Sequence, residues 1–369
     1  MPVYIRGAYL GLLYSFVTYK PTLEPIMPAT AIRIFQIDTH NDQVIPVDKD
    51  QYGKDFEDYL TGLIDIISEG SGRSFIFERD TTEIRTLIPK IISGEEFSVV
   101  SQIAAQRLLS CEKNTQQTIQ KLGKEIQKGI VVQAIIQENN SFRYVICKAD
   151  HSEFLKDGDY TKTKGLPTKK KVFKAFYANF DSTGTVDNVI VYDTNSIMSK
   201  YWWSDFLELT EVYTDKHNTI TAFEAIDKGV LTKMKKDAPQ DYIHLRNSMV
   251  RYFRAHDAFD MQDFLDNAIG DYEPYSGKLK VDTVKNSIKE LSKTKKFDEQ
   301  FNIVKEHVTA RFLNKIQLTK QIDLHLKEDI NDIDNVITAE EGKDGTKYVK
   351  IRSDSGYKYF NDLSKKSKK

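Results

Sequence analysis

Residues 130–148, IVVQAIIQENNSFRYVICK, decide the fold class of this chain. Its apolar runs IVVQAIIQ and FRYVICK flank the polar turn ENNS, which is the pattern of a β-hairpin. A second pair of apolar runs, at 172–180 and 189–192, flanks the turn DSTG in the same way. Two hairpins predict an antiparallel sheet in the first two hundred residues.

Further elements are predicted on the N-terminal side of the hairpins. Apolar side chains recur every three or four residues in segments 51–70 and 98–128, which is typical of amphipathic helices. Strands are expected at 3–19, 31–37 and 74–77, because these runs are rich in aliphatic and aromatic residues. The first part of the chain therefore mixes helices with the antiparallel sheet.

The apolar period changes to 3.6 residues at Lys200 and stays there for about a hundred residues, which predicts a helical region. The expected helices are 201–207, 220–234, 242–253, 261–269 and 281–291. The last part is interpreted as a helix followed by short strands. The helix is expected at 297–313, and the strands at 316–318, 322–326, 348–352 and 357–360.

These patterns predict an α+β fold with four regions. Residues 1–196 form a mixed α/β domain with an antiparallel sheet, and residues 197–296 form a helical middle region. Residues 297–363 form a small C-terminal module of a helix plus strands, and residues 364–369 form a basic disordered tail.

The charge of the chain is balanced overall but uneven locally. Lys and Arg number 53 against 54 Asp and Glu, so the net charge of −1 gives no sign of a polyanionic partner. Residues 38–80 hold eleven acidic residues against four basic ones, a local charge of −7. Residues 343–369 hold nine basic residues against three acidic ones, a local charge of +6. One acidic and one basic stretch are compatible with a polyanion site on one surface.

Cysteine usage and hydropathy favour a protein of the reducing cytoplasm. The two cysteines, Cys111 and Cys147, are too few for a disulfide framework and lack metal-ligand spacing. The apolar run 7–19 lacks a basic cluster and a cleavage site, and it is shorter than the ~20 residues of a membrane span. We therefore expect no membrane segment.

No catalytic signature stands out among the polar motifs. Asp38 and His40 could share a strand face and hold a metal ion, although a polar strand end is the simpler interpretation. Glu341 and Lys343, with Asp334 upstream, match the letters of a nuclease motif, but Gly342 places them in a turn. We therefore expect no enzyme, no catalytic residue, no cofactor and no metal site.

Two smaller motifs also favour structural roles. The glycine-rich GSGRS, residues 70–74, follows a helix, so it suits a helix C-terminus better than a nucleotide loop. The pair Trp202 and Trp203 on a helix suits a core better than a stacking platform.

Two basic clusters are the candidate nucleic-acid contacts. The first lies on a loop that enters a strand, and the second interleaves cations with aromatic residues along strands. The candidates are Lys162, Lys164, Lys169, Lys170, Lys171 and Lys174 in the first cluster, and Lys347, Lys350, Arg352 and Lys358 in the second. Solvated loop lysines and lysine-protected edge strands are the structural alternatives.

The C-terminal stretch resembles the NdpA/YejK-type nucleoid-associated protein family of bacteria. The similarity rests on FDEQF at 297–301, Arg311-Phe312, the strand IDLHL at 322–326, and KYVKI with GYKYF at 347–360. The segment YWWSDFL at 201–207 looks like the aromatic helix of that family. The resemblance implies a cytoplasmic, nucleoid-located and non-enzymatic protein that acts with other chromosome-handling proteins.

We therefore expect a DNA-binding protein that contacts the phosphate backbone with little sequence specificity. One alternative is an interaction protein of phage defence or chromosome maintenance, whose acidic face docks a basic partner. Another is a metal-dependent nuclease centred on Glu341 and Lys343 or on Asp38 and His40. The expected partners are DNA and other chromosome-handling or defence proteins, with a homodimer left open.

Overall fold

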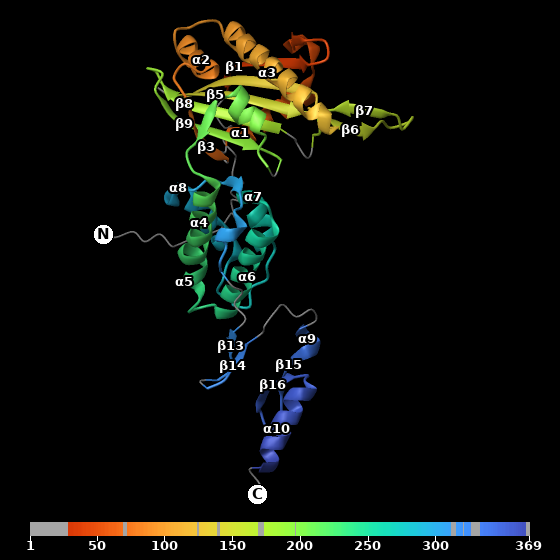
Figure 1. Ribbon diagram of the computed structural model, residues 1–369, viewed down its shortest axis with the longest axis vertical. Coiled ribbons are helices and arrows are strands. Elements are labelled where there is room, and N and C mark those ends of the chain that lie inside the picture. The colour runs from red at the N-terminus through yellow and green to blue at the C-terminus, as the bar shows by residue number, and fades with distance from the viewer. Residues whose placement is uncertain are drawn as a thin grey trace, which may run out of the picture. The chain divides into compact units, whose positions relative to one another are not determined.

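The computed structural model describes residues 29–68, 72–123, 125–138, 141–168, 173–195, 197–310, 315–319, 321–325 and 333–366 (Figure 1). The chain divides into two compact units, Met1–Thr309 and Ala310–Lys369. The sheet and the helical middle region both belong to the first unit. The strand expected at 3–19 lies outside the described residues.

An antiparallel sheet forms the N-terminal half of the first unit. Within the described residues it has eight strands in the order β10–β3–β9–β8–β5–β4–β1–β2. These are β1 (Ala29–Asp38), β2 (Gln43–Pro46), β3 (Arg73–Phe77), β4 (Gly129–Glu138), β5 (Ser141–Asp150), β8 (Phe173–Asp181), β9 (Val186–Asp193) and β10 (Leu209–Glu211). The predicted hairpins are confirmed as β4–β5 and β8–β9, and the α+β class with them.

Helices cover both faces of this sheet (Figure 1). They are α1 (Lys54–Ser68), α2 (Glu83–Ile92), α3 (Phe97–Ile119) and a π-helical turn, η3 (Tyr201–Phe206). Successive side chains of a strand point to opposite faces. Tyr144 therefore packs in one apolar cluster with α2, α3 and η3, whereas Val145 packs in the other with α1. Trp202 is fully buried in the first cluster, as its interpretation as a core residue predicted.

The predicted helical middle region forms the other half of the first unit. Its elements are α4 (Asp215–Ile226), η4 (Asp227–Leu231), α5 (Thr232–Met234), α6 (Pro239–Ala255), β11 (Ala258–Asp260), α7 (Met261–Phe264), η5 (Leu265–Ile269) and α8 (Val281–Lys295). Buried aromatic rings form its core. The ring centroids of Phe253 and Phe259 lie 5.3 Å apart, and Phe259 stacks on Phe301 at 4.8 Å.

The prediction of a helix at 297–313 is wrong for those of its residues that the structure describes. Helix α8 ends at Lys295, the next residue Lys296 caps it in a left-handed conformation, and the chain then extends into β12 (Gln300–Asn302). Strand β12 pairs with β11, and a short 3₁₀ turn, η6 (Lys305–His307), follows. Residues 297–309 therefore belong to the first compact unit, whereas the sequence analysis assigned them to the C-terminal module.

The second unit contains two hairpins and a terminal helix. Its elements are β13 (Lys315–Gln317), β14 (Asp323–His325), α9 (Ile333–Val336), β15 (Ile337–Glu341), β16 (Lys347–Ile351) and α10 (Asp354–Lys366). The strand expected at 357–360 is wrong, because those residues lie within α10. The amide of Gly356 donates to Ser353 Oγ, which satisfies a free donor at the start of this helix. The tail expected to be disordered from 364 is helical as far as Lys366.

Arg73 joins the sheet to the helical middle region. Its side chain is 4% exposed and forms ion pairs with Asp215 at 2.8 Å, Glu211 at 3.1 Å and Asp298 at 3.7 Å. A fourth contact runs from its guanidinium to the carbonyl of Tyr213. The guanidinium fork presents several donors in one plane, so one arginine can hold segments that are far apart in the chain.

Residues 298–302 complete this junction. Asp298 accepts hydrogen bonds from the Ser74 amide of β3 and the Asn218 side chain of α4. Gln300 exchanges two hydrogen bonds with the backbone of Asp193, at the end of β9. Burial raises the pKa of Asp298, while these donors act in the opposite direction. The segment thus contacts the sheet and the helical region at once.

We predict that Asp298→Ala destabilises the first unit strongly. The change leaves Asn218 and the Ser74 amide without an acceptor and removes one carboxylate from buried Arg73. Removing one partner of a buried ion pair costs about 3–5 kcal/mol in the free energy of unfolding. Chemical denaturation followed by circular dichroism measures it. Asp266→Ala, at an exposed position, should change stability by less than about 0.5 kcal/mol; equal losses would contradict the role of Asp298.

Candidate nucleic-acid interface

The first predicted cluster is divided by the structure. Lys162 and Lys164 lie on a two-stranded hairpin, β6 (Ser152–Leu155) with β7 (Lys162–Gly165), which projects from the sheet in Figure 1. Both side chains are exposed, and Lys164 forms an ion pair with Glu153 at 3.2 Å. Lys169, Lys170 and Lys171 lie outside the described residues.

Lys174 requires a correction. It lies in β8 and is 6% exposed, and its ammonium contacts Asp150 at 2.7 Å. Its neighbours across the sheet are Lys148 of β5 and Asp193 of β9. A side chain enclosed in this way cannot reach a phosphate group, so Lys174 is removed from the candidate set. The run of lysines in the sequence could not reveal that Lys174 is buried, because its ion-pair partner Asp150 belongs to a different strand.

Lys174 is part of a buried ionic cluster that ties α3 to the sheet. The ammonium of Lys148 contacts Glu112 of α3 at 2.6 Å and Asp150 at 3.2 Å, and it donates to the Gln127 carbonyl. Burial alone would lower the pKa of Lys148, but the carboxylates of Glu112 and Asp150 outweigh burial and raise it. Lys148 therefore stays protonated. The four charged side chains of this cluster are 1–6% exposed, which suits a structural role better than contact with a substrate.

The second cluster is exposed throughout. Lys347, Lys350, Arg352 and Lys358 all lie at the surface of the C-terminal unit. Lys350 forms an ion pair with Glu340 on the paired strand β15. Within the described residues, the other three cations have no ion-pair partner. Lys162 of the first cluster likewise has no ion-pair partner among the described residues.

Aromatic rings accompany these cations. Tyr348 is 48% exposed on β16, and α10 exposes Tyr357 by 73%, Tyr359 by 64% and Phe360 by 69%. Every buried hydrophobic residue among those described belongs to the first unit, the last being Val308. The C-terminal unit thus presents these rings to solvent, Tyr348 on a strand as the sequence analysis expected and the other three on a helix.

A polar hollow that the sequence did not reveal adjoins the β6–β7 hairpin. It has a volume of about 450 Å³, and its lining includes His40, Lys113, Gln117, Lys128 and Lys164. Lys113 forms an ion pair with Asp42 at 2.7 Å. Ammonium, amide and imidazole groups are the usual donors to phosphate and sugar oxygens. These residues come from four separate segments, so no local spacing could have identified the hollow.

The two nuclease alternatives gain no support from the geometry. Asp38 accepts the amides of His40 and Asn41, so its carboxylate closes a turn, and these bonds lower its pKa. Glu341 ends β15, and Lys343 lies in the β15–β16 turn. Within the described residues, no three His, Cys, Asp or Glu side chains converge to hold a metal ion.

Comparisons with known proteins leave the family open. A scan against protein-family models found no match, and a search of curated proteins found no match either. The resemblance to the nucleoid-associated family therefore stays a prediction. None of the helices in the described part of the chain combines the length and the apolar content that a membrane span requires.

We predict that substitution of two lysines of the first cluster changes stability to very different extents. Lys174→Ala leaves Asp150 with Lys148 as its remaining cation, so the free energy of unfolding should fall by about 3 kcal/mol. Lys162→Ala removes an exposed charge and should change stability by less than about 0.5 kcal/mol. Urea denaturation of both variants measures the difference. A Lys174→Ala protein as stable as wild type would contradict the structural role of Lys174 in the buried ionic cluster.

Proposed function

We propose that this protein binds DNA by contacting the phosphate backbone with little sequence specificity. It acts as a non-enzymatic, nucleoid-located component of the cytoplasm, in line with the family resemblance. Its proposed contacts are Lys162 and Lys164 in the first unit, and Lys347, Lys350, Arg352 and Lys358 in the second. Lysine and arginine on a phosphate backbone displace counterions without reading the base sequence.

The observation that carries this proposal is the combination of cations and rings in the C-terminal unit. Lys347, Tyr348 and Lys350 follow one another along β16, while α10 carries Lys358 between Tyr357 and Tyr359. A ring can stack on any base or sugar while the neighbouring cation holds a phosphate. Such a surface tolerates different sequences, which supports backbone binding over base readout.

A second candidate is an adaptor that docks a basic protein. Helix α1 carries Asp55, Glu57 and Asp58 within its first turns, and Asp55 and Asp58 are exposed. Its opposite side, with Leu63, is buried in the core. An acidic exposed face favours a basic partner. A partner retained in a pull-down after nuclease digestion would support the adaptor; loss of every partner after digestion would support association through DNA.

We predict that DNA affinity falls steeply with salt and depends on three exposed cations. Fluorescence anisotropy on two unrelated duplexes across a salt series measures both. Wild type should bind both duplexes alike, with a steep decrease of log K against log salt. The triple variant Lys347→Ala/Arg352→Ala/Lys358→Ala should lower that slope by about one for each phosphate that these side chains neutralise in the wild type.

A matched control variant separates the loss of direct DNA contacts from the change in the net charge of the protein. The triple variant Lys54→Ala/Lys121→Ala/Lys216→Ala removes three exposed cations of the first unit and changes the net charge equally. It should retain nearly the wild-type slope. Absence of binding to any duplex at low salt, or equal losses in the two triple variants, would overturn the proposal.

A further inference from the structure

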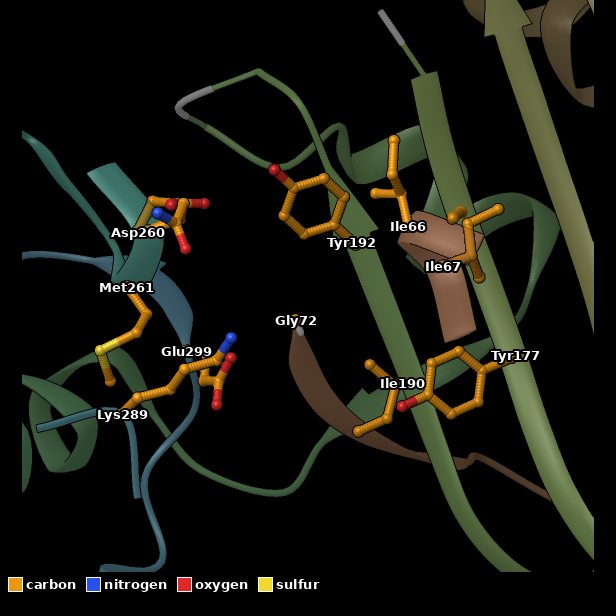
Figure 2. Close-up of a pocket in the computed structure, with 12 residues that line it drawn as sticks. Ile66, Ile67, Gly72, Tyr177, Ile190, Tyr192, Asp260, Met261, Lys289 and Glu299 are labelled. Atoms are coloured by element: carbon orange, nitrogen blue, oxygen red, sulfur yellow. The ribbon is translucent and has the colours of Figure 1, made fainter. Parts of the chain in front are cut away.

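A partly open cavity lies within the first unit, where the sheet meets the helical middle region (Figure 2). Its walls come from α1, from β8 and β9, and from the segments around Asp260, Lys289 and Glu299. Its volume is about 130 Å³. An apolar protein cavity of about 150 Å³ can hold a molecule the size of benzene, so this space is suited to a small organic ligand.

One wall of the cavity is apolar and aromatic. Ile66 and Ile67 of α1 and Ile190 of β9 contribute aliphatic surface. Tyr177 of β8 and Tyr192 of β9 add two rings (Figure 2). Within the described part of the chain, neither phenol hydroxyl has a hydrogen-bond partner. The wall can therefore pack against an apolar body and offers two unused hydroxyl groups at its edge.

The opposite wall is charged. Asp260 accepts the amide of Asp263 as the N-cap of α7, and Glu299 accepts the hydroxyl of Ser292 at 2.6 Å. A carboxylate has about four acceptor positions, so both groups retain capacity for a ligand. Lys289 is the cation of this wall, but within the described residues it forms no ion pair with either carboxylate. Two carboxylates against one ammonium leave the cavity with a charge of −1.

The charges of this wall act on one another and on the rings. Burial raises the pKa of Asp260, and the carboxylates of Asp263 and Glu299 add to this, while the backbone amides of Gln262 and Asp263 act in the opposite direction. Burial also raises the pKa of Tyr192 to about 12, with Asp260 contributing. Burial is the main cause of both shifts, and the neighbouring carboxylates add to it. A cation between the two carboxylates would relieve their repulsion.

We propose that this cavity binds a small organic amine with an apolar body. The ammonium group lies between Asp260 and Glu299, and the apolar body packs on Tyr177, Tyr192 and Ile190. Aromatic faces attract cations, so the two rings add to the preference of the cavity for a positively charged ligand. The ligand touches both halves of the first unit, so its binding stabilises their junction. This site is independent of the proposed DNA contacts, none of which lines the cavity.

Benzylamine, benzyl alcohol and benzoate form a matched set of probes with the same ring and different charge. Isothermal titration and saturation-transfer NMR on the full chain measure their binding. Benzylamine should bind with a dissociation constant on the order of 0.1–1 mM, because about eight heavy atoms give modest affinity. Benzyl alcohol should bind at least about tenfold more weakly, since it lacks the charge-assisted bond. Benzoate should not bind.

Amino-acid substitutions test whether benzylamine binds in this cavity. Asp260→Asn/Glu299→Gln should weaken benzylamine at least about tenfold while leaving benzyl alcohol unchanged, and Asn keeps the N-cap role. Asp237→Asn/Glu273→Gln, at exposed positions that do not line the cavity, is the control of equal charge change. Tyr177→Phe/Tyr192→Phe keeps both rings and both carboxylates, so it should change the affinity for benzylamine by less than about threefold. Equal binding of the three probes, no binding of benzylamine, or equal losses in the acidic variant and its control would overturn the proposal.

Discussion

Burial of Arg73 is the constraint on which the first unit depends. A guanidinium cannot lose its charge in a protein, so an arginine that is 4% exposed must be surrounded by acceptors. Those acceptors come from β10, α4 and residue 298, and the last of them lies 225 positions after Arg73 in the sequence (298 − 73). The sheet and the helical region can close on each other only when all three segments arrive together. The FDEQF segment is therefore a junction element, in which three polar residues stand between the buried rings of Phe297 and Phe301.

The second buried ionic cluster fixes α3 in the same manner. Lys148 and Lys174 lie side by side on β5 and β8, where like charges would repel if Glu112 and Asp150 were absent. Buried ion pairs add little net stability over apolar packing, but a single missing partner is costly. We infer that these clusters specify one arrangement of helix and sheet. They also decide which lysines remain at the surface for a partner.

The sequence predicted those parts of the fold that depend on local patterns. The hairpins at residues 130–148 and 172–192 were recognisable because alternation and turn chemistry lie within one segment. The helix expected at 297–313 failed because Phe297, Phe301 and Val308 have helical spacing, whereas Asp298 and Gln300 bond to distant strands that hold the chain extended. Tertiary contacts therefore overrode the local period. Short apolar runs such as 357–360 fit either a strand or a helix, and the Ser353 cap favours the helix.

The candidate sites follow the same division between local and tertiary information. Exposed cations among aromatics are visible in a linear pattern, so Lys347, Arg352 and Lys358 could be identified from the amino-acid sequence alone. Lys174 has the same pattern, but the acid that buries it, Asp150, is 24 residues away. The junction cavity has no linear signature, since α1, two strands and residues 260–299 each supply part of its wall. Its polar groups adjoin the Arg73 junction, where Glu299 donates its amide to the Gly72 carbonyl. A ligand there would act on the contact that holds the unit together, whereas a polyanion on the proposed surface cations would leave that contact undisturbed.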